Sequence, residues 1–240
     1  MTDSSTPNAP ELDELGRDVV ACRACPRLVE WRERVAREKR ASFADEEYWG
    51  RPVPGFGDPE ARLLIVGLAP AAHGANRTGR MFTGDRSGDW LFRALHRAGF
   101  ANQPNGRSRD DGLRLHEAWL TASLRCAPPE NRPRPRERKN CRPFLEREFE
   151  YFLPRIDVLV ALGGYAFDHV LRILRDRSWP VPSPKPGFGH GVELTLESGG
   201  RALTLLGSYH PSQQNTFTGT LTEEAFDDLW SRARECLKSP

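Results

Sequence analysis

Two loops in this sequence hold the residues whose types and spacing could do chemistry. The first, GLAPAAHGANRTGRMFTGD at residues 67–85, combines small residues with an aromatic ring at Phe82 and a carboxylate at Asp85. It has neither the G-x4-G-K-[ST] pattern of a phosphate-binding loop nor the G-x-G-x-x-G pattern of a dinucleotide-binding loop. Its alanines would instead let a flat ligand approach the backbone, and Phe82 could stack on that ligand.

The second loop, GSYHPSQQNTFTG at residues 207–219, places His210 directly after a predicted strand. A histidine at such a strand end could act on a ligand as a catalytic or contacting group. The Gln, Asn and Thr side chains that follow could lie on a phosphate backbone, and Phe217 or a glutamine could enter a stack of bases. A single histidine or phenylalanine more often serves packing, so neither loop defines a function alone.

Four of the five cysteines form a third candidate site. They are spaced C-x2-C and C-x14-C, at Cys22, Cys25, Cys126 and Cys141. Four thiolates can hold a structural Zn²⁺ ion or a [4Fe–4S] cluster. The wide second spacing favours iron–sulfur over a zinc ribbon, and buried cysteines without a metal are the remaining alternative. The fifth, Cys236, shares an apolar helix stripe and is expected to pack in the core.

A basic strip lies between the last two of these cysteines, in CAPPENRPRPRERKNC. It carries five cations, and after the prolines Glu137 is the one acidic residue that stands against them. Such a strip favours contact with a polyanion, and a solvated charged face is the alternative. The five cations are Arg132, Arg134, Arg136, Arg138 and Lys139.

The elements that must position these residues alternate between strand and helix. Apolar runs predict strands near residues 61–69, 118–126, 156–163 and 201–211, with a further strand at 192–198 joined to the last by a Gly-Gly turn. This order predicts a three-layer α/β/α fold around a central, mostly parallel four-stranded sheet. The carboxyl ends of parallel strands share one edge, so the loops should form a site there.

Two prolines refine the predicted bounds of the helices. Pro26 predicts a break in the N-terminal helical segment beside the C-x2-C pair. Pro143 predicts that the helix expected within residues 135–153 starts near Cys141. Residues 1–10 are predicted to be a disordered tail, and residues 11–240 a single domain. A metal centre held by both cysteine pairs would tie the N-terminal helical segment to that domain.

Bulk composition excludes few functions. The 240 residues carry a net charge of +2, with 38% hydrophobic and 28% charged residues, as in an ordinary globular protein. The polar first twenty residues do not resemble a signal peptide, and no apolar run reaches the roughly 18 residues of a membrane span. We therefore expect a cytoplasmic protein with no membrane partner.

Taken together and in this order, the motifs resemble the uracil-DNA glycosylase superfamily, and best its iron–sulfur family 5 (the UdgB type). Residues 67–85 are similar to that family's first motif, and residues 207–219 to its His-Pro-Ser motif. The stretches LRCAPPENRP and CRPFLE resemble its cysteine-bearing segments, and ALGGYAF its intervening strand and helix. The resemblance covers about residues 22–237.

The resemblance implies a monofunctional, base-flipping DNA N-glycosylase with a structural [4Fe–4S] cluster, acting in base excision repair. Its expected substrate is double-stranded DNA with uracil and other deaminated bases such as hypoxanthine, and we expect a monomer. The implied catalytic residues are His210, Asp85 and Asn131. The implied base-binding residues are Gly67, Ala69, Ala71, His73 and Phe82, and the implied DNA contacts are Arg132, Arg134, Ser212, Gln213, Gln214 and Asn215.

Two departures from related families shape the expected mechanism. Leu68 and Ala69 stand where those families carry an acidic or amide residue that handles water, so no base is available there. Ala122 and Ser123 lie where the sister iron–sulfur family has an asparagine that reads uracil. Losing such a reader relaxes the choice of base. The alternatives left open are a non-catalytic iron–sulfur DNA-binding module, a small-nucleotide hydrolase and an electron-transfer protein.

Overall fold

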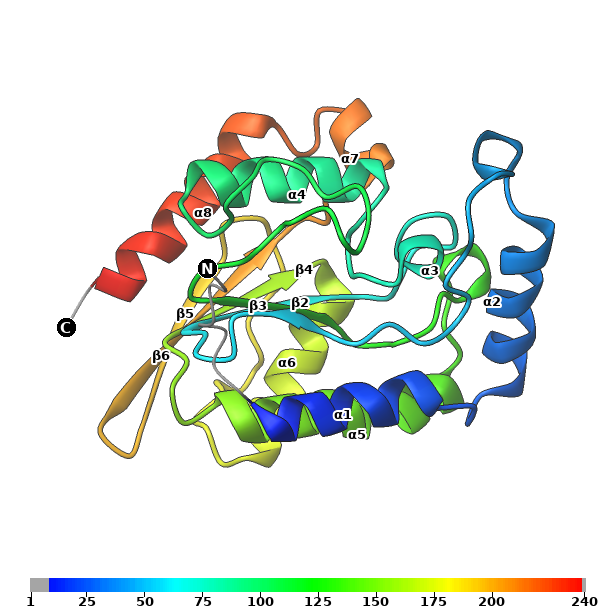
Figure 1. The fold of residues 1–240 in the computed structure, drawn as a ribbon. Coiled ribbons are helices and arrows are strands. Elements are labelled where there is room, and N and C mark those ends of the chain that lie inside the picture. The colour runs from blue at the N-terminus through cyan, green and yellow to red at the C-terminus, as the bar shows by residue number, and fades with distance from the viewer. Residues whose placement is uncertain (1–8, 239–240) are drawn as a thin grey trace, which may run out of the picture.

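The computed structural model describes residues 9–238 (Figure 1). Its strands are β1 (Phe56–Gly57), β2 (Leu63–Gly67), β3 (Ala118–Ala122), β4 (Val158–Leu162), β5 (Glu193–Ser198) and β6 (Arg201–Ser208). Its helices are α1 (Pro10–Ala21), α2 (Pro26–Glu38), α3 (Ala75–Thr78), α4 (Arg86–Arg97), α5 (Pro135–Phe152), α6 (Gly164–Asp176), α7 (Gln213–Phe217) and α8 (Glu223–Lys238). Short 3-10 turns cover Ala41–Phe43 and Pro129–Asn131.

The sheet runs in the order β1-β3-β2-β4-β6-β5. Its four central strands are parallel, as predicted, and β1 and β5 add an antiparallel edge on each side. The sheet therefore has six strands rather than four. The two-residue β1 is too short to give a periodic signal, and β5 forms a hairpin with β6 through the predicted turn at Gly199 and Gly200.

Two apolar layers enclose the sheet. Alternate residues of β2 point to opposite faces: Leu63 and Ile65 pack in one cluster, and Leu64 and Val66 in the other. The first cluster joins the sheet to α4 and α8, and the second joins it to α5 and α6 (Figure 1). All five residues of β2 are buried, which is why this strand reads as a continuous apolar run.

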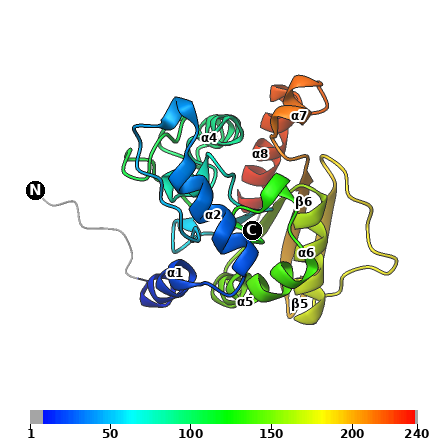
Figure 2. The same cartoon turned by 90° about the vertical axis from the view of Figure 1, so that its right-hand side faces the viewer.

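The carboxyl ends of the parallel strands meet at one edge, which Figure 2 faces. Gly67 pairs with Ala122, and Leu162 pairs with Ser208. The loops that follow β2, β3 and β6 therefore begin side by side. These are the loops that carry the first motif, the cysteine-bearing strip and the His-Pro-Ser motif.

The N-terminal segment breaks as predicted. Cys22 directly follows α1, and Cys25 precedes Pro26, the first residue of α2. Of the tail predicted over residues 1–10, residues 1–8 lie outside the described part of the chain. Ala9 is buried against the core, and Pro10 begins α1. Among residues 9–238 there is no helix both long and apolar enough to span a bilayer.

Helix α5 begins earlier than predicted. It starts at Pro135 and runs through Pro143, so the expected start near Cys141 is wrong. The Glu137 side chain accepts a hydrogen bond from the backbone N–H of Arg134 at 2.7 Å, which stabilises the first turn. Pro135 occupies the position where a helix best tolerates proline. Cys141 consequently lies inside the helix, which fixes its direction.

Candidate active site and thiol site

One pocket of about 500 Å³ opens where the loops after β2, β3 and β6 converge. Phe82 and His210 lie in this same pocket, together with small residues of the first loop. A nucleobase fits easily in this volume, since ligand pockets typically measure about 300–1,000 Å³. The lining residues are Leu68, Ala69, Ala71, Phe82, Asp85, Arg86, Ser87, Asn131, His210, Ser212, Gln213 and Gln214.

His210 lies just beyond the end of β6 and is held by its own loop. The side chain of Asn215 donates a hydrogen bond to the backbone oxygen of His210 at 2.9 Å, and the N–H of Ser212 donates to the same oxygen at 2.7 Å. Burial lowers the pKa of His210 to about 4, so its imidazole is neutral at pH 7. A neutral imidazole retains one N–H, and can donate it to a ligand.

Phe82 packs on this imidazole. The two ring centroids lie 5.5 Å apart at an interplanar angle of 25°, which is a stacked arrangement. Phe82 has a positive φ of 53°, a conformation costly for a bulky residue and concentrated at functional sites. Gly67 permits the approach, because a Cβ there would lie 2.9 Å from the Phe82 ring. Gly67 therefore acts by making room for the ring and does not itself line the pocket.

Asp85 has a structural role as well as a place in the pocket. Its Oδ1 accepts a hydrogen bond from the N–H of Gly88 at 2.9 Å and caps α4. Its Oδ2 lies against Gly74, where a Cβ would approach that oxygen to 2.0 Å. Burial raises the pKa of Asp85 above its usual value. One carboxylate oxygen is thus committed to the helix, and the group is partly desolvated.

Three other predicted residues differ in their positions. Asn131 is exposed and lines the pocket, with a positive φ of 56°. His73 does not line the pocket, since its Nδ1 lies 3.0 Å from the hydroxyl oxygen of Tyr48. Asn215 acts behind His210, through its bond to the backbone. The loop spacing alone could not separate these roles.

Pocket residues that the sequence did not single out are Arg86 and Ser87, in the first turn of α4. The signal in the sequence that could have identified them is that they directly follow Asp85. His190 was also missed: its Nδ1 accepts a bond from the N–H of Tyr209 at 3.4 Å, and its Nε2 lies 3.0 Å from the backbone oxygen of Ala225. It ties the segment before His210 to α8, from a loop with no recognisable motif.

The four predicted thiols line one cavity between α2, α5 and the segment after β3. Donors surround the sulfurs: Arg32 Nη1 lies 2.9 Å from Cys126 Sγ, and the N–H of Arg125 lies 3.2 Å from Cys141 Sγ. Burial raises the pKa of Cys126 to about 11 and that of Cys141 to about 12. In the described chain, no three His, Cys, Asp or Glu side chains come together closely enough for a single metal ion.

A buried ion pair supports this thiol site. Arg125 Nη2 lies 2.5 Å from Glu148 Oε2, and both side chains are at most 2% exposed. Glu148 also accepts hydrogen bonds from Trp119 Nε1 at 3.1 Å and from Thr121 Oγ1 at 2.7 Å. Arg125 directly precedes Cys126, so this network fixes the backbone that carries the third thiol.

The predicted DNA contacts divide into two groups. Ser212, Gln213 and Gln214 line the pocket at the start of α7. Arg132 has a side chain 84% exposed, with only a loose 3.7 Å pair to Glu130, and Arg134 is also exposed. Their guanidinium groups are therefore accessible to a polyanion beside the pocket.

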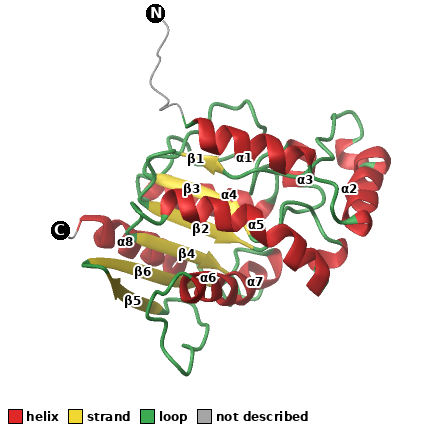
Figure 3. Cartoon of the chain, turned by 90° about the horizontal axis from the view of Figure 1, so that it is seen from below, coloured by secondary structure: helices red, strands yellow, loops and turns green. Residues whose placement is uncertain are grey.

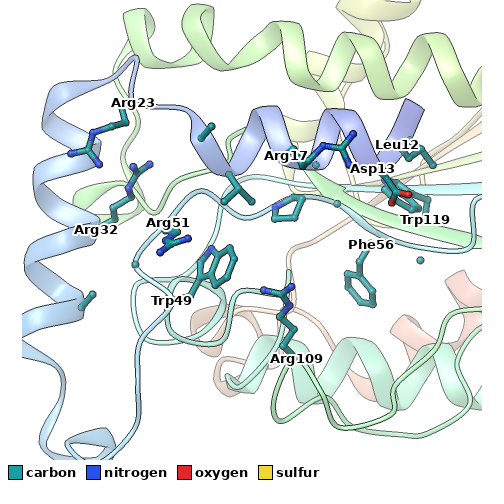
Figure 4. Close-up of a pocket in the computed structure, with 18 of the residues that line it drawn as sticks. Leu12, Asp13, Arg17, Arg23, Arg32, Trp49, Arg51, Phe56, Arg109 and Trp119 are labelled. Carbon is teal, nitrogen blue, oxygen red and sulfur yellow. The ribbon is translucent and has the colours of Figure 1, made fainter. Parts of the chain in front are cut away.

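A larger cavity lies elsewhere in the molecule. It measures about 1,480 Å³ and lies between α1, α2 and the segment 49–59. Figure 4 shows the Trp49 ring between the guanidinium groups of Arg51 and Arg109, which lie 5.5 and 4.7 Å from the ring centroid. No histidine of the described chain lines it. Size alone therefore does not mark the catalytic pocket.

The fold and the site together are those of a known class of protein. A sequence model of the uracil DNA glycosylase superfamily matches residues 54–234, which is most of the described chain. The chain therefore belongs to the uracil DNA glycosylase superfamily.

Relatives place the chain more narrowly. It is 55% identical to a protein of Mycobacterium tuberculosis named type-5 uracil-DNA glycosylase, over 92% of this chain and 80% of the relative. Proteins of the same name are 54% identical in Mycobacterium leprae (95% of this chain, 96% of the relative) and 51% identical in Thermus thermophilus (90% and 94%). The chain thus belongs to the type-5 family, which confirms the resemblance to family 5.

Proposed function

We propose that this protein flips uracil out of double-stranded DNA and hydrolyses its N-glycosyl bond, as a monomer, in base excision repair. Membership of the family makes the chain an enzyme that hydrolyses N-glycosyl bonds. The observation that carries the proposal is the shared pocket of Phe82 and His210. A non-catalytic DNA-binding module would have no use for a desolvated imidazole beside a cavity of nucleobase size.

The pocket supports a mechanism without a strong general base. Leu68 and Ala69 line it where a water-activating carboxylate or amide would otherwise be expected. Cleavage of an N-glycosyl bond is largely dissociative, so the base leaves as an anion and the sugar becomes cationic. The N–H of neutral His210 stabilises that departing anion by hydrogen bonding. Phe82 holds the imidazole in place and closes the pocket wall.

Asp85 is the candidate for holding the attacking water or the sugar cation, with Asn131 as the second. We expect Asp85→Asn to lower the single-turnover rate of uracil release by at least about tenfold, because it removes a charge that stabilises the cationic sugar. The amide keeps an oxygen that can cap α4, so the fold should remain. Rates are measured with the enzyme in excess over a labelled duplex.

Asp228→Asn is the matched control for Asp85→Asn, since Asp228 is exposed on α8. If Asp85→Asn releases uracil at the wild-type rate, Asp85 serves only as a helix cap. Thermal unfolding of both variants is monitored alongside, to separate a loss of charge from a loss of structure.

The pocket also supports a wider choice of bases, including hypoxanthine. Ala122 ends β3 and Ser123 follows it, and neither carries an amide that could read the edge of uracil. A site without such an amide does not leave an amide unpaired when another base enters. Deaminated purines are therefore included in the proposed substrates.

Base flipping requires that the gap in the duplex be held open. Phe217 is the single large hydrophobic side chain in the described chain that is strongly exposed, at 65%, and Arg86 lies over its ring at 4.2 Å. It lies at the end of α7, whose first residues line the pocket. An aromatic wedge here can replace the flipped base in the stack. Arg132 and Arg134 would hold the backbone nearby.

The thiol site fits a [4Fe–4S] cluster. Four cysteines line one cavity, and N–H donors approach the sulfurs of Cys126 and Cys141. A cluster spreads its four thiolates over four irons, whereas zinc gathers them on one ion. When bound, such a cluster would brace the segment between α1 and α2 against α5 and take no part in the chemistry.

We expect purified protein to hold about four irons and four sulfides per chain and to absorb near 400 nm. Cys126→Ser should lower the iron content, because it removes one of the four ligands. Cys236→Ser is the matched control, since Cys236 does not line the cavity. One zinc per chain without iron would overturn the iron–sulfur assignment.

The experiment that tests the function measures free base released from labelled duplexes that contain uracil or hypoxanthine, with cluster-loaded protein. We expect release of both bases, and no strand cleavage until the abasic product is treated with alkali. Binding of DNA without release of either base would favour the alternative of a non-catalytic DNA-binding module. Release of uracil alone would remove hypoxanthine from the proposal.

A further inference from the structure

A second cavity, of about 490 Å³, lies between α5 and α6. Figure 3 shows these two helices on the same face of the sheet. Its lining belongs to the N-terminal part of α5 and the first nine residues of α6, and none of it lines the catalytic pocket. The lining residues are Pro135, Arg138, Lys139, Arg142, Tyr165, Asp168, His169 and Arg172.

The cavity carries an excess of positive charge. Of its four cations, Arg142 is bound by Glu146 at 2.6 Å and by Asp176. Lys139 and Arg172 have no carboxylate partner within residues 9–238. Asp168 is the one carboxylate in the lining, and Lys185 from outside the cavity already pairs with it. The cavity therefore lacks an anion to balance its cations.

Two buried nitrogen atoms in the lining also lack partners. His169 is 5% exposed, and its Nδ1 has no hydrogen-bond partner. The buried Nε of Arg138 has none either, while the guanidinium carbon lies 4.5 Å from the centroid of the Tyr165 ring. Buried polar atoms are nearly always satisfied, so these two atoms beside the cavity call for a partner such as an ordered water or an anion. A tetrahedral oxyanion would accept bonds from Arg138 Nε and from the Nδ1–H tautomer of His169, and would meet Lys139 and Arg172.

The chain connects this cavity to the catalytic pocket. Asn131 lines the pocket and Pro135 lines the cavity, and the exposed Arg132 and Arg134 lie between them. Pro135 is also the first residue of an 18-residue helix, whose amino end carries partial positive charge. Positive groups thus continue from the pocket to the cavity, as phosphates continue along a DNA strand from a flipped nucleotide.

We propose that the cavity between α5 and α6 binds a backbone phosphate of the same DNA, in the arm that flanks the flipped nucleotide. This inference rests on the proposed function, because it places the base in the catalytic pocket. It assigns Arg172, Lys139 and His169 to a contact remote from the chemistry. The contact anchors one arm of the duplex and sets how much flanking DNA the enzyme needs for tight binding.

The test uses Arg172→Gln in cluster-loaded enzyme and a series of duplexes with one uracil, shortened base pair by base pair from either end. We expect the variant to raise the Kd of the longest duplex about tenfold, the scale of one charge-assisted hydrogen bond. Trimming one arm beyond a certain length should make the Kd of wild type and variant equal. Trimming the other arm should preserve the difference.

Salt dependence gives a second measurement. On the long duplex, the slope of log K against log salt concentration should fall by about one for loss of one phosphate contact. Lys139→Gln should reproduce both results. Arg175→Gln is the matched control: it is exposed like Arg172, lies three residues further along the same helix, removes the same charge and does not line the cavity.

Each outcome decides between interpretations. A loss of affinity that is equal on every duplex length, or equal for Arg172→Gln and Arg175→Gln, shows a diffuse field and overturns the phosphate site. An unchanged Kd overturns it as well. If wild-type enzyme releases no uracil from the long duplex, the proposed function fails, whereas normal release without length dependence removes only this inference.

Discussion

Replacing His210 with alanine is expected to slow single-turnover release of uracil by about 10²- to 10³-fold, the cost of removing one donor to a developing anion. Binding of the duplex should change little, because the contacts assigned to the DNA backbone lie on other residues. The loss should therefore appear in the rate at saturating enzyme and not in the Kd of the duplex. His96→Ala is the matched control, since His96 is exposed on α4 and does not line the pocket.

The pH profile of the wild-type enzyme checks the charge state of the same group. Free histidine titrates near pH 6.5, whereas burial lowers the pKa of His210 to about 4. Because the folded pKa is the lower one, His210 stays neutral as pH falls through 6.5 and gains its proton only near pH 4. Titration of His210 should therefore cause no change in the wild-type rate near pH 6.5. Any step at that pH should also be present in His210→Ala. A step that disappears in His210→Ala would mean that the imidazole acts as a cation.

The positions of the motifs followed from the sequence because strand ends are local features. Buried apolar runs mark β2 and β6, and parallel pairing brings the loops behind Gly67 and Ser208 to one edge. The same reasoning predicts that Phe82 and His210 face one site, and both line the pocket. It could not show that the two rings stack, since a relative ring angle depends on packing between loops 128 residues apart.

Other features depend on tertiary contacts that no local pattern encodes. Pro143 is a helix breaker by propensity, yet α5 continues through it, because its ends are fixed by Pro135 and by burial of Phe149 and Phe152. His73 lies in the first motif, and only the position of Tyr48, 25 residues earlier in the chain, shows that its Nδ1 faces away from the pocket. The ion pair of Arg125 and Glu148 could not be predicted either, because charged residues in a sequence are expected at the surface.

That ion pair is where a single substitution should cost most stability. Glu148→Ala is expected to lower the free energy of unfolding by about 3–5 kcal/mol, the usual cost of leaving one member of a buried pair uncompensated. The guanidinium of Arg125, 1% exposed on its side chain, would lose its carboxylate, and Trp119 Nε1 and Thr121 Oγ1 would lose their acceptor. Urea unfolding followed by circular dichroism measures the change.

Glu150→Ala is the matched control on the same helix. Its side chain is 67% exposed and pairs with Arg177 at 3.0 Å, so its removal should cost no more than about 1 kcal/mol. Glu148→Ala should also lower the iron content per chain, because Arg125 supplies the N–H that bonds Cys141 Sγ and directly precedes Cys126. Equal unfolding midpoints for the two variants would show that the pair adds no net stability, and an unchanged iron content in Glu148→Ala would show that the thiol site does not depend on it.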